Sequence, residues 1–598
     1  MKKKSNANLA FISLRVLAGF LAAAFIVFAL ARSDAVGDTL LCGNVTTSNC
    51  SNPTMTVNVC AHDGSPLVTD IYLKDNARRP VLVLRGCEAR CGIAAQVLQT
   101  IWPPNATYDL VVQDIRGSPF CHERAFIGDL LYKFDQDDSH ALLEYIDQQT
   151  WSQGADGRIA MNVWSNGGVV NYLAAVGAGA SLRGIQTHYA TGDLLNYGLF
   201  NGGVLHNEIP FPYDLPVKPS WAEYVGWRIW DKYLITDNDA ALAKVAGLHV
   251  GGWFDVSGQG ILDSFSRLQI AGGTGARLNQ KVVIGPWTHG GEGSPPVGQI
   301  QFPLPTPSNP SLSDYDAKWK KGVLENNWTE WNALPAVKVY LMNAPQGTEW
   351  TTYTTWPPPA VEVPFYFTLT RALSRTPQRV NGQLPFTSDP SHPCPTLGGT
   401  NNLTSCAEPS PVPCGPWDQR PIEGRSDVVV FTSGPDPLGN GGPIVGRIYA
   451  DVWIATDLPD VDVFVRMTDV YPNNGPSMLM AQGIQRARYR NGVCPQPPDL
   501  RPPTRVRVDL GSTAFVLGTG HKLRVIVSAS AGPNHAGGHP LYSVNPQNED
   551  EYTGAHPNVT GSIKVLAGTG QASVLVLPVP TPGPTPPDRR PNTTPCPN

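Results

Sequence analysis

The sequence predicts a fold in two parts, with an α/β domain in the first half and an all-β sandwich in the second. Its 598 residues exceed what one domain usually holds, so several structural units are expected. Short apolar runs alternate with helical stretches up to about residue 300. After about residue 360, runs that alternate apolar and polar residues lie between clusters of Gly, Pro and Asn. This change of pattern predicts a change from α/β to all-β structure.

Five apolar runs in the first half lack polar alternation and are too short for helices. They predict strands buried on both faces, and therefore a mostly parallel sheet covered by helices. The runs are 80–85, 108–113, 158–164, 247–251 and 280–285. Between the third and the fourth, residues 191–245 carry Trp221, Trp227 and Trp230 at helical offsets. This segment is longer than an ordinary crossover and predicts a small helical cap.

The second half predicts an antiparallel sandwich without helical stretches. Its strand-like runs are 427–432, 444–455, 461–468, 505–510, 522–527 and 573–577. The Pro/Thr-rich end, 580–598, is predicted to be disordered. We therefore expect an α/β domain over 54–360 with its cap at 191–245, and a sandwich over 361–579, after a cysteine-containing segment at 36–53.

The first 35 residues predict an export signal. Lys2, Lys3 and Lys4 precede an apolar run from Val16 to Ala31 that ends in small residues suited to signal peptidase. An uncleaved membrane anchor is the alternative, since the apolar character extends back to Leu9. Either way the bulk of the chain is expected outside the cytoplasm, secreted or held by that anchor.

The cysteine content and the net charge limit which cellular compartment and which binding partners are expected. Eleven cysteines in separated clusters favour local disulfides over a metal site, and the odd count leaves one thiol over, for which Cys596 is a candidate. The formal charge is −5 and no long basic run follows the first residues, so the sequence does not predict a basic surface for nucleic acid or an anionic membrane. A small molecule or short peptide is the expected partner, and the oligomeric state stays open.

Polar residues follow three of the predicted strands where each strand ends. Ser165 comes after the run 158–164 and precedes Asn166-Gly167-Gly168 and a helical stretch, which is the strand, tight turn and helix of a nucleophile elbow. Asp255 and His289 close the segments that follow the last two runs. Because open parallel sheets place ligands at the carboxyl ends of their strands, these side chains are expected to meet there.

The three residue types together predict nucleophilic catalysis. Ser165 would attack an acyl carbon, His289 would accept and return its proton, and Asp255 would orient the imidazole. The backbone N–H of Asn166, at the start of the next helix, would stabilise the oxyanion. Taken singly, a serine in this position is more often only part of a turn, and an aspartate in this position more often only caps a helix. The occurrence of Ser, Asp and His in this order at the strand ends of one sheet favours catalysis. An imidazole base also predicts activity that rises with pH through the neutral range and then levels off.

Several separate blocks resemble the cocaine esterase-like and Xaa-Pro dipeptidyl-peptidase-like serine hydrolases, which include α-amino acid ester hydrolases. The blocks are 113–117, 156–168, 251–255, 284–289, 350–358, 415–420 and 483–489, in the family's order. The resemblance covers roughly residues 54–578. It implies an α/β-hydrolase domain with a short helical cap, then a jelly-roll β-sandwich, and the triad Ser165, Asp255 and His289. It also implies that neither a metal nor an organic cofactor takes part.

The sequence departs from the family pattern beside the elbow. The family's oxyanion tyrosine is replaced by Glu88, whose carboxylate accepts hydrogen bonds and would repel an oxyanion. The bulky Trp164 lies directly before the nucleophile. Asn166, Glu88 and Trp164 are accordingly the candidate oxyanion or substrate contacts, and the acidic residues of the cap, Asp193 among them, are interpreted as solvated surface.

The leading hypothesis is an exported serine hydrolase that cleaves an ester or amide through an acyl-enzyme. Two alternatives stay open. One is an exopeptidase that releases Xaa-Pro dipeptides, with Glu88 as a candidate partner for the substrate's amine. The other is a secreted binding protein on a hydrolase scaffold that has lost catalysis, an idea motivated by the altered oxyanion block.

Overall fold

The structure is a computed structural model, and it describes most of the chain outside the two ends and several loops. The described residues are 40–42, 52–86, 90, 100–116, 132, 134–206, 235–291, 297–303, 311–400, 414–439, 442–492, 499–533, 542 and 559–581. The predicted export signal at 1–35, most of the segment 36–53 and nearly all of the tail 580–598 lie outside them.

The first half forms one ten-stranded sheet, with the strand order β1-β2-β4-β3-β5-β6-β9-β10-β11-β12. Its strands are β1 (Met55–Cys60), β2 (Pro66–Tyr72), β3 (Val81–Gly86), β4 (Asp109–Asp114), β5 (Ile159–Trp164), β6 (Leu182–His188), β9 (Ala246–Gly252), β10 (Gln280–Gly285), β11 (Val337–Tyr340) and β12 (Trp350–Tyr353). The strands from β4 to β11 pair in parallel, and β1, β2 and β12 add antiparallel edges. The predicted mostly parallel sheet is therefore present, and all five predicted runs are strands in it.

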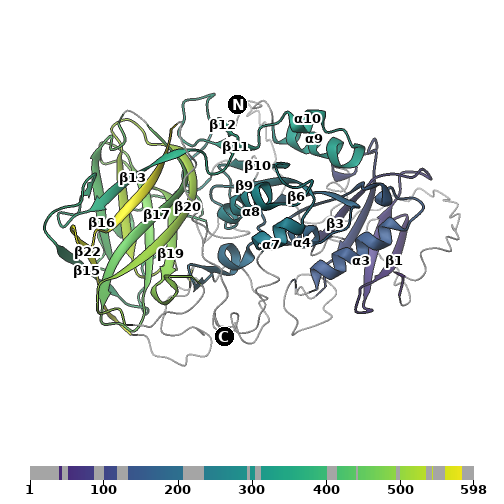
Figure 1. Cartoon of the computed structure of the whole chain (residues 1–598). Helices are drawn as coiled ribbons and strands as arrows, with labels where there is room; N and C mark the ends of the chain where they lie inside the picture. The colour runs from purple at the N-terminus through teal and green to yellow at the C-terminus, as the bar shows by residue number, and fades with distance from the viewer. Residues whose placement is uncertain are drawn as a thin grey trace, which may run out of the picture.

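Helices cover both faces of this sheet (Figure 1). They are α3 (Asp135–Asp147), α4 (Ser165–Ala175), α7 (Asp237–Leu242), α8 (Gly258–Ala271), α9 (Leu312–Glu325) and α10 (Thr329–Asn332). Val81 and Val83 of β3 belong to one buried cluster with residues of α3 and α4, while Leu82 and Leu84 belong to another with residues of α9. Successive side chains of a strand point to opposite faces, so β3 is apolar from Val81 to Leu84 because both faces are buried.

The second half is an all-β unit of two antiparallel sheets. The larger has the order β14-β13-β23-β17-β22-β15 with β20 also paired to β17, and the smaller has the order β16-β21-β18-β19. The strands are β13 (Ala360–Phe367), β14 (Leu373–Ser374), β15 (Gly382–Ser388), β16 (Val428–Pro435), β17 (Pro443–Thr456), β18 (Asp462–Val470), β19 (Ser477–Arg486), β20 (Thr504–Val516), β21 (Lys522–Ser528), β22 (Gly561–Ala567) and β23 (Val574–Pro580). A short helix, α11 (Arg420–Glu423), precedes β16.

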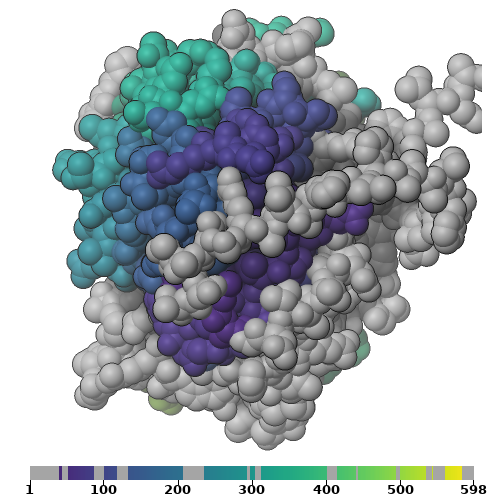
Figure 2. Space-filling model, turned by 90° about the vertical axis from the view of Figure 1, so that its right-hand side faces the viewer, coloured from purple at the N-terminus to yellow at the C-terminus, as the bar shows by residue number. Residues whose placement is uncertain are grey.

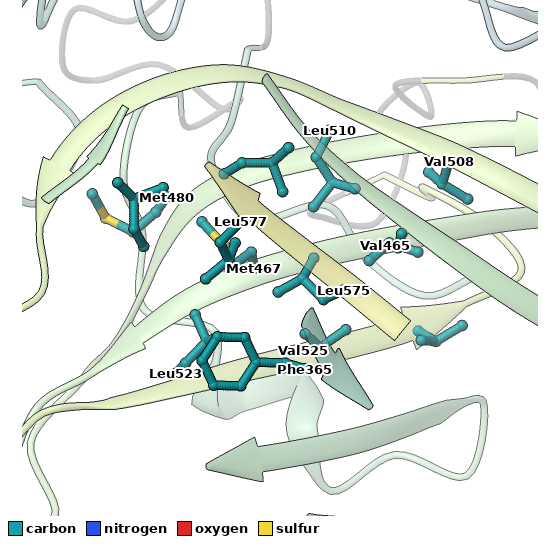
Figure 3. Close-up of a cluster of buried hydrophobic side chains, with 14 of the residues drawn as sticks. Phe365, Val465, Met467, Met480, Val508, Leu510, Leu523, Val525, Leu575 and Leu577 are labelled. Carbon is teal, nitrogen blue, oxygen red and sulfur yellow. The ribbon is translucent and has the colours of Figure 1, made fainter. Parts of the chain in front are cut away.

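Alternate side chains of both sheets meet in one apolar core. Figure 3 shows Phe365 and Leu575 of the larger sheet facing Met467 and Val525 of the smaller one, and all four belong to the same buried cluster. The cluster continues through Trp253 and Ile284 of the first half, so the two halves share one core. Figure 2 shows the end of the molecule that faces away from this sandwich. The purple segments near the N-terminus lie there beside blue and teal segments from later in the first half of the chain. The narrower jelly-roll assignment stays a prediction.

The predicted cap is described only in part. Between β6 and β9 the chain forms a single π-helical turn η3 (Leu195–Leu199), a hairpin of β7 (Phe200–Asn201) and β8 (Val204–Leu205), and then α7. Residues 207–234, which hold the three tryptophans behind the prediction, lie outside the described residues. The described part of the segment thus contains a hairpin that the helical offsets did not predict.

Cys42 and Cys60 form a disulfide, and Cys414 is also disulfide-bonded. In the part of the chain that the structure covers, Cys394 is the free cysteine and is buried, whereas the candidate Cys596 lies outside that part. Within the same part, no helix combines the length and the apolar character needed to cross a bilayer.

His206, the residue that follows the hairpin, should make the stability of the protein depend on pH. Neither of its ring nitrogens has a hydrogen-bond partner among the described residues, its ring contacts Tyr542 edge-on, and burial lowers its pKa to about 3. An unfolded histidine binds a proton near pH 6.5 whereas the folded one does not, so the folded state loses stability as pH falls from about 6.5 towards 3, by roughly 1.4 kcal/mol per pH unit. His206→Phe should therefore become steadily more stable than the wild type on acidification.

Urea unfolding of both proteins at pH 7 and pH 4.5 measures this difference. His392→Phe is the matched control because His392 is exposed. A difference between His206→Phe and the wild type that is the same at both pH values would contradict a buried, neutral His206.

Candidate active site

Ser165 lies at the sharp turn that joins β5 to α4. Its φ is 51°, a left-handed conformation that costs energy for a residue with a side chain and that clusters at functional sites. The glycines that follow make the turn possible: a Cβ at Gly167 would come within 2.6 Å of Val163 and 2.7 Å of the Arg85 carbonyl oxygen, and one at Gly168 within 2.4 Å of Ala190. The helix can begin this close to the sheet only with glycine at both positions.

Asp255 and His289 come from the loops after two neighbouring strands, β9 and β10, which end in register at Gly252 and Gly285. Backbone hydrogen bonds join the loops, from Trp253 N to Gly285 O at 2.9 Å and from Phe254 N to Trp287 O at 3.0 Å. A Cβ at Gly252 would lie 2.1 Å from the Trp287 carbonyl oxygen, so the two loops are in close contact. This contact fixes the aspartate relative to the histidine.

The three side chains form one hydrogen-bonded chain. His289 Nδ1–H donates to Asp255 Oδ1 at 2.9 Å, and the Ser165 hydroxyl donates to His289 Nε2 at 3.0 Å. Asp255 is 1% exposed, and its Oδ1 also accepts from the Ser257 backbone N–H at 3.1 Å. An ionised carboxylate can only accept, so the imidazole carries its proton on Nδ1 and offers the Nε2 lone pair to Ser165. This is the geometry in which an imidazole can take the serine proton.

The surroundings of this chain include two of the three predicted contact residues. The Tyr189 ring lies against the His289 ring with centroids 5.5 Å apart, and Tyr189 itself has a φ of 51° at the end of β6. Trp164 is 39% exposed beside Ser165, and Asn166 occupies the first turn of α4. Glu88 lies outside the described residues, so its place relative to Ser165 stays a prediction.

A second, fully buried polar chain lies under the triad, and the sequence reasoning did not find it. The Tyr172 hydroxyl on α4 donates to His249 Nδ1 on β9 at 2.6 Å, and His249 Nε2–H donates to Gln280 Oε1 on β10 at 3.0 Å. The Gln280 amide nitrogen donates to two carbonyl oxygens, which fixes Oε1 as the acceptor. Burial lowers the pKa of His249 to about 4, so it is neutral at pH 7. The chain ties together the three elements that position Ser165, Asp255 and His289.

Replacing Tyr172 should therefore slow the reaction of Ser165. Tyr172→Phe leaves His249 Nδ1 with only the distant Thr187 hydroxyl at 3.5 Å. The loss of the shorter hydrogen bond costs about 1–3 kcal/mol of unfolding free energy, and it frees α4 to shift relative to β9 and β10. We expect both a lower unfolding free energy and slower phosphonylation of Ser165 by a fluorophosphonate probe.

Tyr315→Phe is the matched control, because Tyr315 also donates one hydrogen bond, to Pro335 O, but does so from α9. The control should lose stability while keeping the rate of phosphonylation. Equal slowing in both variants, or in neither, would show that the buried chain does not position the triad.

Arg85 forms a buried charge cluster near the elbow. It is fully buried and donates to Gln113 at 2.7 Å, Asp135 at 2.6 Å, Ser139 at 3.2 Å and Asp138 at 3.3 Å. Burial raises the pKa of both Asp135 and Asp138 although the guanidinium opposes the shift. The cluster ties the end of β3, whose Arg85 carbonyl faces Gly167, to the start of α3.

Asp193 corrects one expectation from the sequence. It is 3% exposed rather than solvated, and it accepts hydrogen bonds from the backbone and side-chain nitrogens of Asn196. Its burial, only partly offset by these bonds, raises its pKa to about 6. The carboxylate follows β6 and is enclosed at the start of the segment predicted as the cap. The prediction of a solvated Asp193 was therefore wrong, because it rested only on the polarity of the side chain.

Among the described residues, no group of three or more His, Cys, Asp or Glu side chains is arranged to hold a metal ion. The site therefore consists of a serine at an elbow, a histidine and a carboxylate at one edge of a mostly parallel sheet, next to a C-terminal all-β unit. Together these features resemble the active sites of the α/β-hydrolase class of protein.

Comparisons with known proteins agree with this class. Residues 329–576 match the X-Pro dipeptidyl-peptidase C-terminal non-catalytic domain. The chain is 25% identical over 551 residues to cocaine esterase from Rhodococcus sp. (strain MB1 Bresler), covering 80% of this chain and 91% of that protein. The chain is therefore similar to cocaine esterase over most of its length and to the X-Pro dipeptidyl-peptidase family in its C-terminal half, and these likenesses indicate a hydrolase.

Solved structures share the fold. An α-amino acid ester hydrolase superposes with a TM-score of 0.68 at 20% identity, covering 88% of this chain and 96% of that one. An aminopeptidase from a Thaumarchaeota archaeon gives 0.67 at 18% identity, covering 90% and 98%. A CocE/NonD family hydrolase from Staphylococcus aureus gives 0.63 at 15% identity, covering 90% and 100%. At these identities the likeness concerns the fold alone.

Proposed function

We propose that the protein is a serine hydrolase that cleaves an ester or amide bond through an acyl-enzyme, with Ser165, His289 and Asp255 as its triad. The observation that carries this proposal is the continuous hydrogen-bonded chain from Ser165 Oγ through His289 to Asp255, with distances of 3.0 Å and 2.9 Å. The left-handed φ of Ser165 supports it further, because strain of this kind is kept where it serves a function.

In this mechanism the Ser165 oxygen attacks the acyl carbon while His289 Nε2 takes the hydroxyl proton. Asp255 stabilises the imidazolium that forms and holds its orientation. His289 then gives the proton to the leaving alcohol or amine, and the acyl group remains on Ser165. A water molecule that loses its proton to His289 attacks the ester and frees the acid, which restores the serine.

The oxyanion is stabilised at the start of α4. In the proposal the Asn166 backbone N–H is one donor, because Asn166 follows the nucleophile directly in the first turn of α4, where the helix N-terminus favours negative charge. Glu88 stands where the family has a tyrosine, so the second donor must come from another group. Trp164, which is exposed beside Ser165, is the proposed wall of the substrate site.

Labelling with a fluorophosphonate tests this proposal. The reagent reacts with an activated serine, so we expect one adduct on the peptide that contains Ser165, and none in Ser165→Ala. Ser257→Ala is the matched control, since Ser257 lies in the Asp255 loop and its contact with Asp255 is through the backbone. Folded wild-type protein that remains unlabelled would refute the proposed nucleophile.

A second candidate is release of Xaa-Pro dipeptides, favoured by the match of the C-terminal half to the X-Pro dipeptidyl-peptidase domain. That reaction needs a carboxylate free to bind the substrate's amine. Glu88 is the residue proposed for it, since Asp193 is already bonded to Asn196. Comparing aryl esters with dipeptide anilides as substrates separates the two activities.

The proposal also places the protein outside the cytoplasm, acting on a small ester, amide or short peptide and not on nucleic acid. The basic start and apolar run of residues 1–35 support export, and the Cys42–Cys60 disulfide fits an oxidising compartment. N-terminal sequencing of the exported protein distinguishes a cleaved signal from an anchor.

A further inference from the structure

A cavity of about 400 Å³ lies beside the triad carboxylate, between the two halves of the molecule. Its wall includes Asp255 and the start of α8, the turn of the β7–β8 hairpin, and parts of β19 and β20. Neither Ser165 nor His289 is among its lining residues. The cavity therefore adjoins the triad at the carboxylate and is separate from the nucleophile.

Four residues of this wall carry buried polar atoms that have no hydrogen-bond partner within the described structure. The atoms are Asp255 Oδ2, Asn201 Oδ1, Ser512 Oγ, Gln482 Oε1 and Gln482 Nε2. Among the described residues, the two donors that reach Asp255 both bond to Oδ1, and Oδ2 has no partner there. Burying a polar atom without a partner costs free energy, so such a concentration in one cavity indicates an occupant that hydrogen-bonds.

The charged side chains of the same wall other than Asp255 already have partners among the described residues, and Arg490 donates to the Ala487 carbonyl oxygen at 2.9 Å. Arg507 pairs with Asp451 at 2.8 Å, and Asp509 accepts two hydrogen bonds from Arg447 Nε at 3.1 Å. The occupant is thus selected by neutral hydrogen bonding and by Asp255, and not by a charged pair.

The unpaired atoms define the chemistry of the occupant. They are three acceptor oxygens, one hydroxyl and one amide NH₂ group, which has two N–H donors. An ammonium group could satisfy the acceptors but would leave the Gln482 N–H unpaired, whereas hydroxyl groups both donate and accept. Trp253 and Tyr489 add aromatic surface to the wall, and the volume is that of an ordinary small-ligand site.

We propose that this cavity binds a small neutral polyol of pyranose size, with one hydroxyl donating to Asp255 Oδ2 and others bonded to Asn201, Gln482 and Ser512. No bond of the ligand is made or broken at this site. The ligand contacts both halves of the molecule and touches the carboxylate that orients His289, so its binding is coupled to the reacting triad.

Isothermal titration calorimetry of the full chain tests the proposal, with Ser165→Ala as the background so that no probe is consumed. The probes are D-glucose, D-galactose and N-acetyl-D-glucosamine, with methylammonium chloride and cyclohexanol as mismatched molecules. We expect at least one pyranose to bind with a dissociation constant below about 1 mM and both mismatched molecules to bind more weakly.

Gln482→Leu should weaken binding of that pyranose about tenfold, because two hydrogen-bonding atoms are lost. Ser512→Leu should abolish it by filling the cavity. Gln383→Leu is the matched control, since Gln383 is exposed on β15 outside the cavity. Near-ultraviolet circular dichroism checks each fold, and if Gln482→Leu does not fold, Ser512→Leu decides.

The proposal is overturned if no pyranose binds more tightly than about 100 mM, as for a cavity that holds water only. It is equally overturned if Gln482→Leu and Ser512→Leu bind as tightly as Gln383→Leu. Because the background already lacks Ser165, a failed labelling of Ser165 and a failed sugar titration are separate results.

Discussion

Asp255→Asn should lower kcat on the order of 10⁴-fold while the protein stays folded. An asparagine can present its amide NH₂ to His289 Nδ1, which moves the imidazole proton to Nε2, where it faces Ser165. The imidazole can then no longer accept the serine proton, although the three side chains remain in place. Steady-state kinetics on an aryl ester that the wild type hydrolyses measures the loss.

Asp193→Asn is the matched control for this substitution. Asp193 is also a buried carboxylate, but its hydrogen bonds go to Asn196 and not to a histidine. We expect it to retain activity within about tenfold, corresponding to roughly 1.4 kcal/mol of barrier. A loss of less than tenfold in Asp255→Asn would show that the carboxylate does not set the state of His289.

The second large effect is on stability. Arg85→Met should lower the unfolding free energy by about 3–5 kcal/mol at pH 7, because it leaves Asp135 buried without the guanidinium that lies 2.6 Å from it. Asp138 also loses its contact with Arg85 at 3.3 Å but keeps its ion pair with Arg116 at 2.7 Å. The loss should be smaller at pH 5. The freed carboxyls bind protons more readily when folded than when unfolded, so the variant gains relative stability as pH falls.

Arg79→Met tests the same change of residue at a partly exposed pair. Arg79 bonds to Asp75, whose side chain is 50% exposed, and water and salt screen such exposed pairs so that they add little to stability. Urea unfolding of both variants makes the comparison. A cost for Arg85→Met no larger than for Arg79→Met would mean that the buried cluster adds nothing to stability.

Strands with an uninterrupted apolar run could be predicted from the sequence alone. Strand β3 is apolar at most positions because each face packs on a different layer, and that run is visible without coordinates. Strand β6 was missed because Gly184, Gln186 and Thr187 interrupt its apolar pattern. Their polar atoms are satisfied inside the protein, for example by Thr187 donating to the Tyr172 hydroxyl, and such pairing is invisible in one sequence.

In the candidate site, too, some residues could be predicted from the sequence and others could not. Ser165, Asp255 and His289 could be proposed because each follows a strand end, where an open parallel sheet gathers its ligands. His249 and Gln280 lie within strands, and their pairing depends on the register of β9 and β10. The unpaired atoms around Asp255 depend on how β19 and β20 meet the hydrolase half, a contact between residues more than 200 positions apart in the chain.

Trapping the acyl-enzyme is the most direct test of the reaction proposed at Ser165. Protein mixed with a slowly deacylating aryl ester, quenched in acid and digested, should show the acyl mass on the peptide containing Ser165 and on no other. The same adduct should disappear in Ser165→Ala together with turnover. Turnover without any adduct on Ser165, undiminished in Ser165→Ala, would contradict the account.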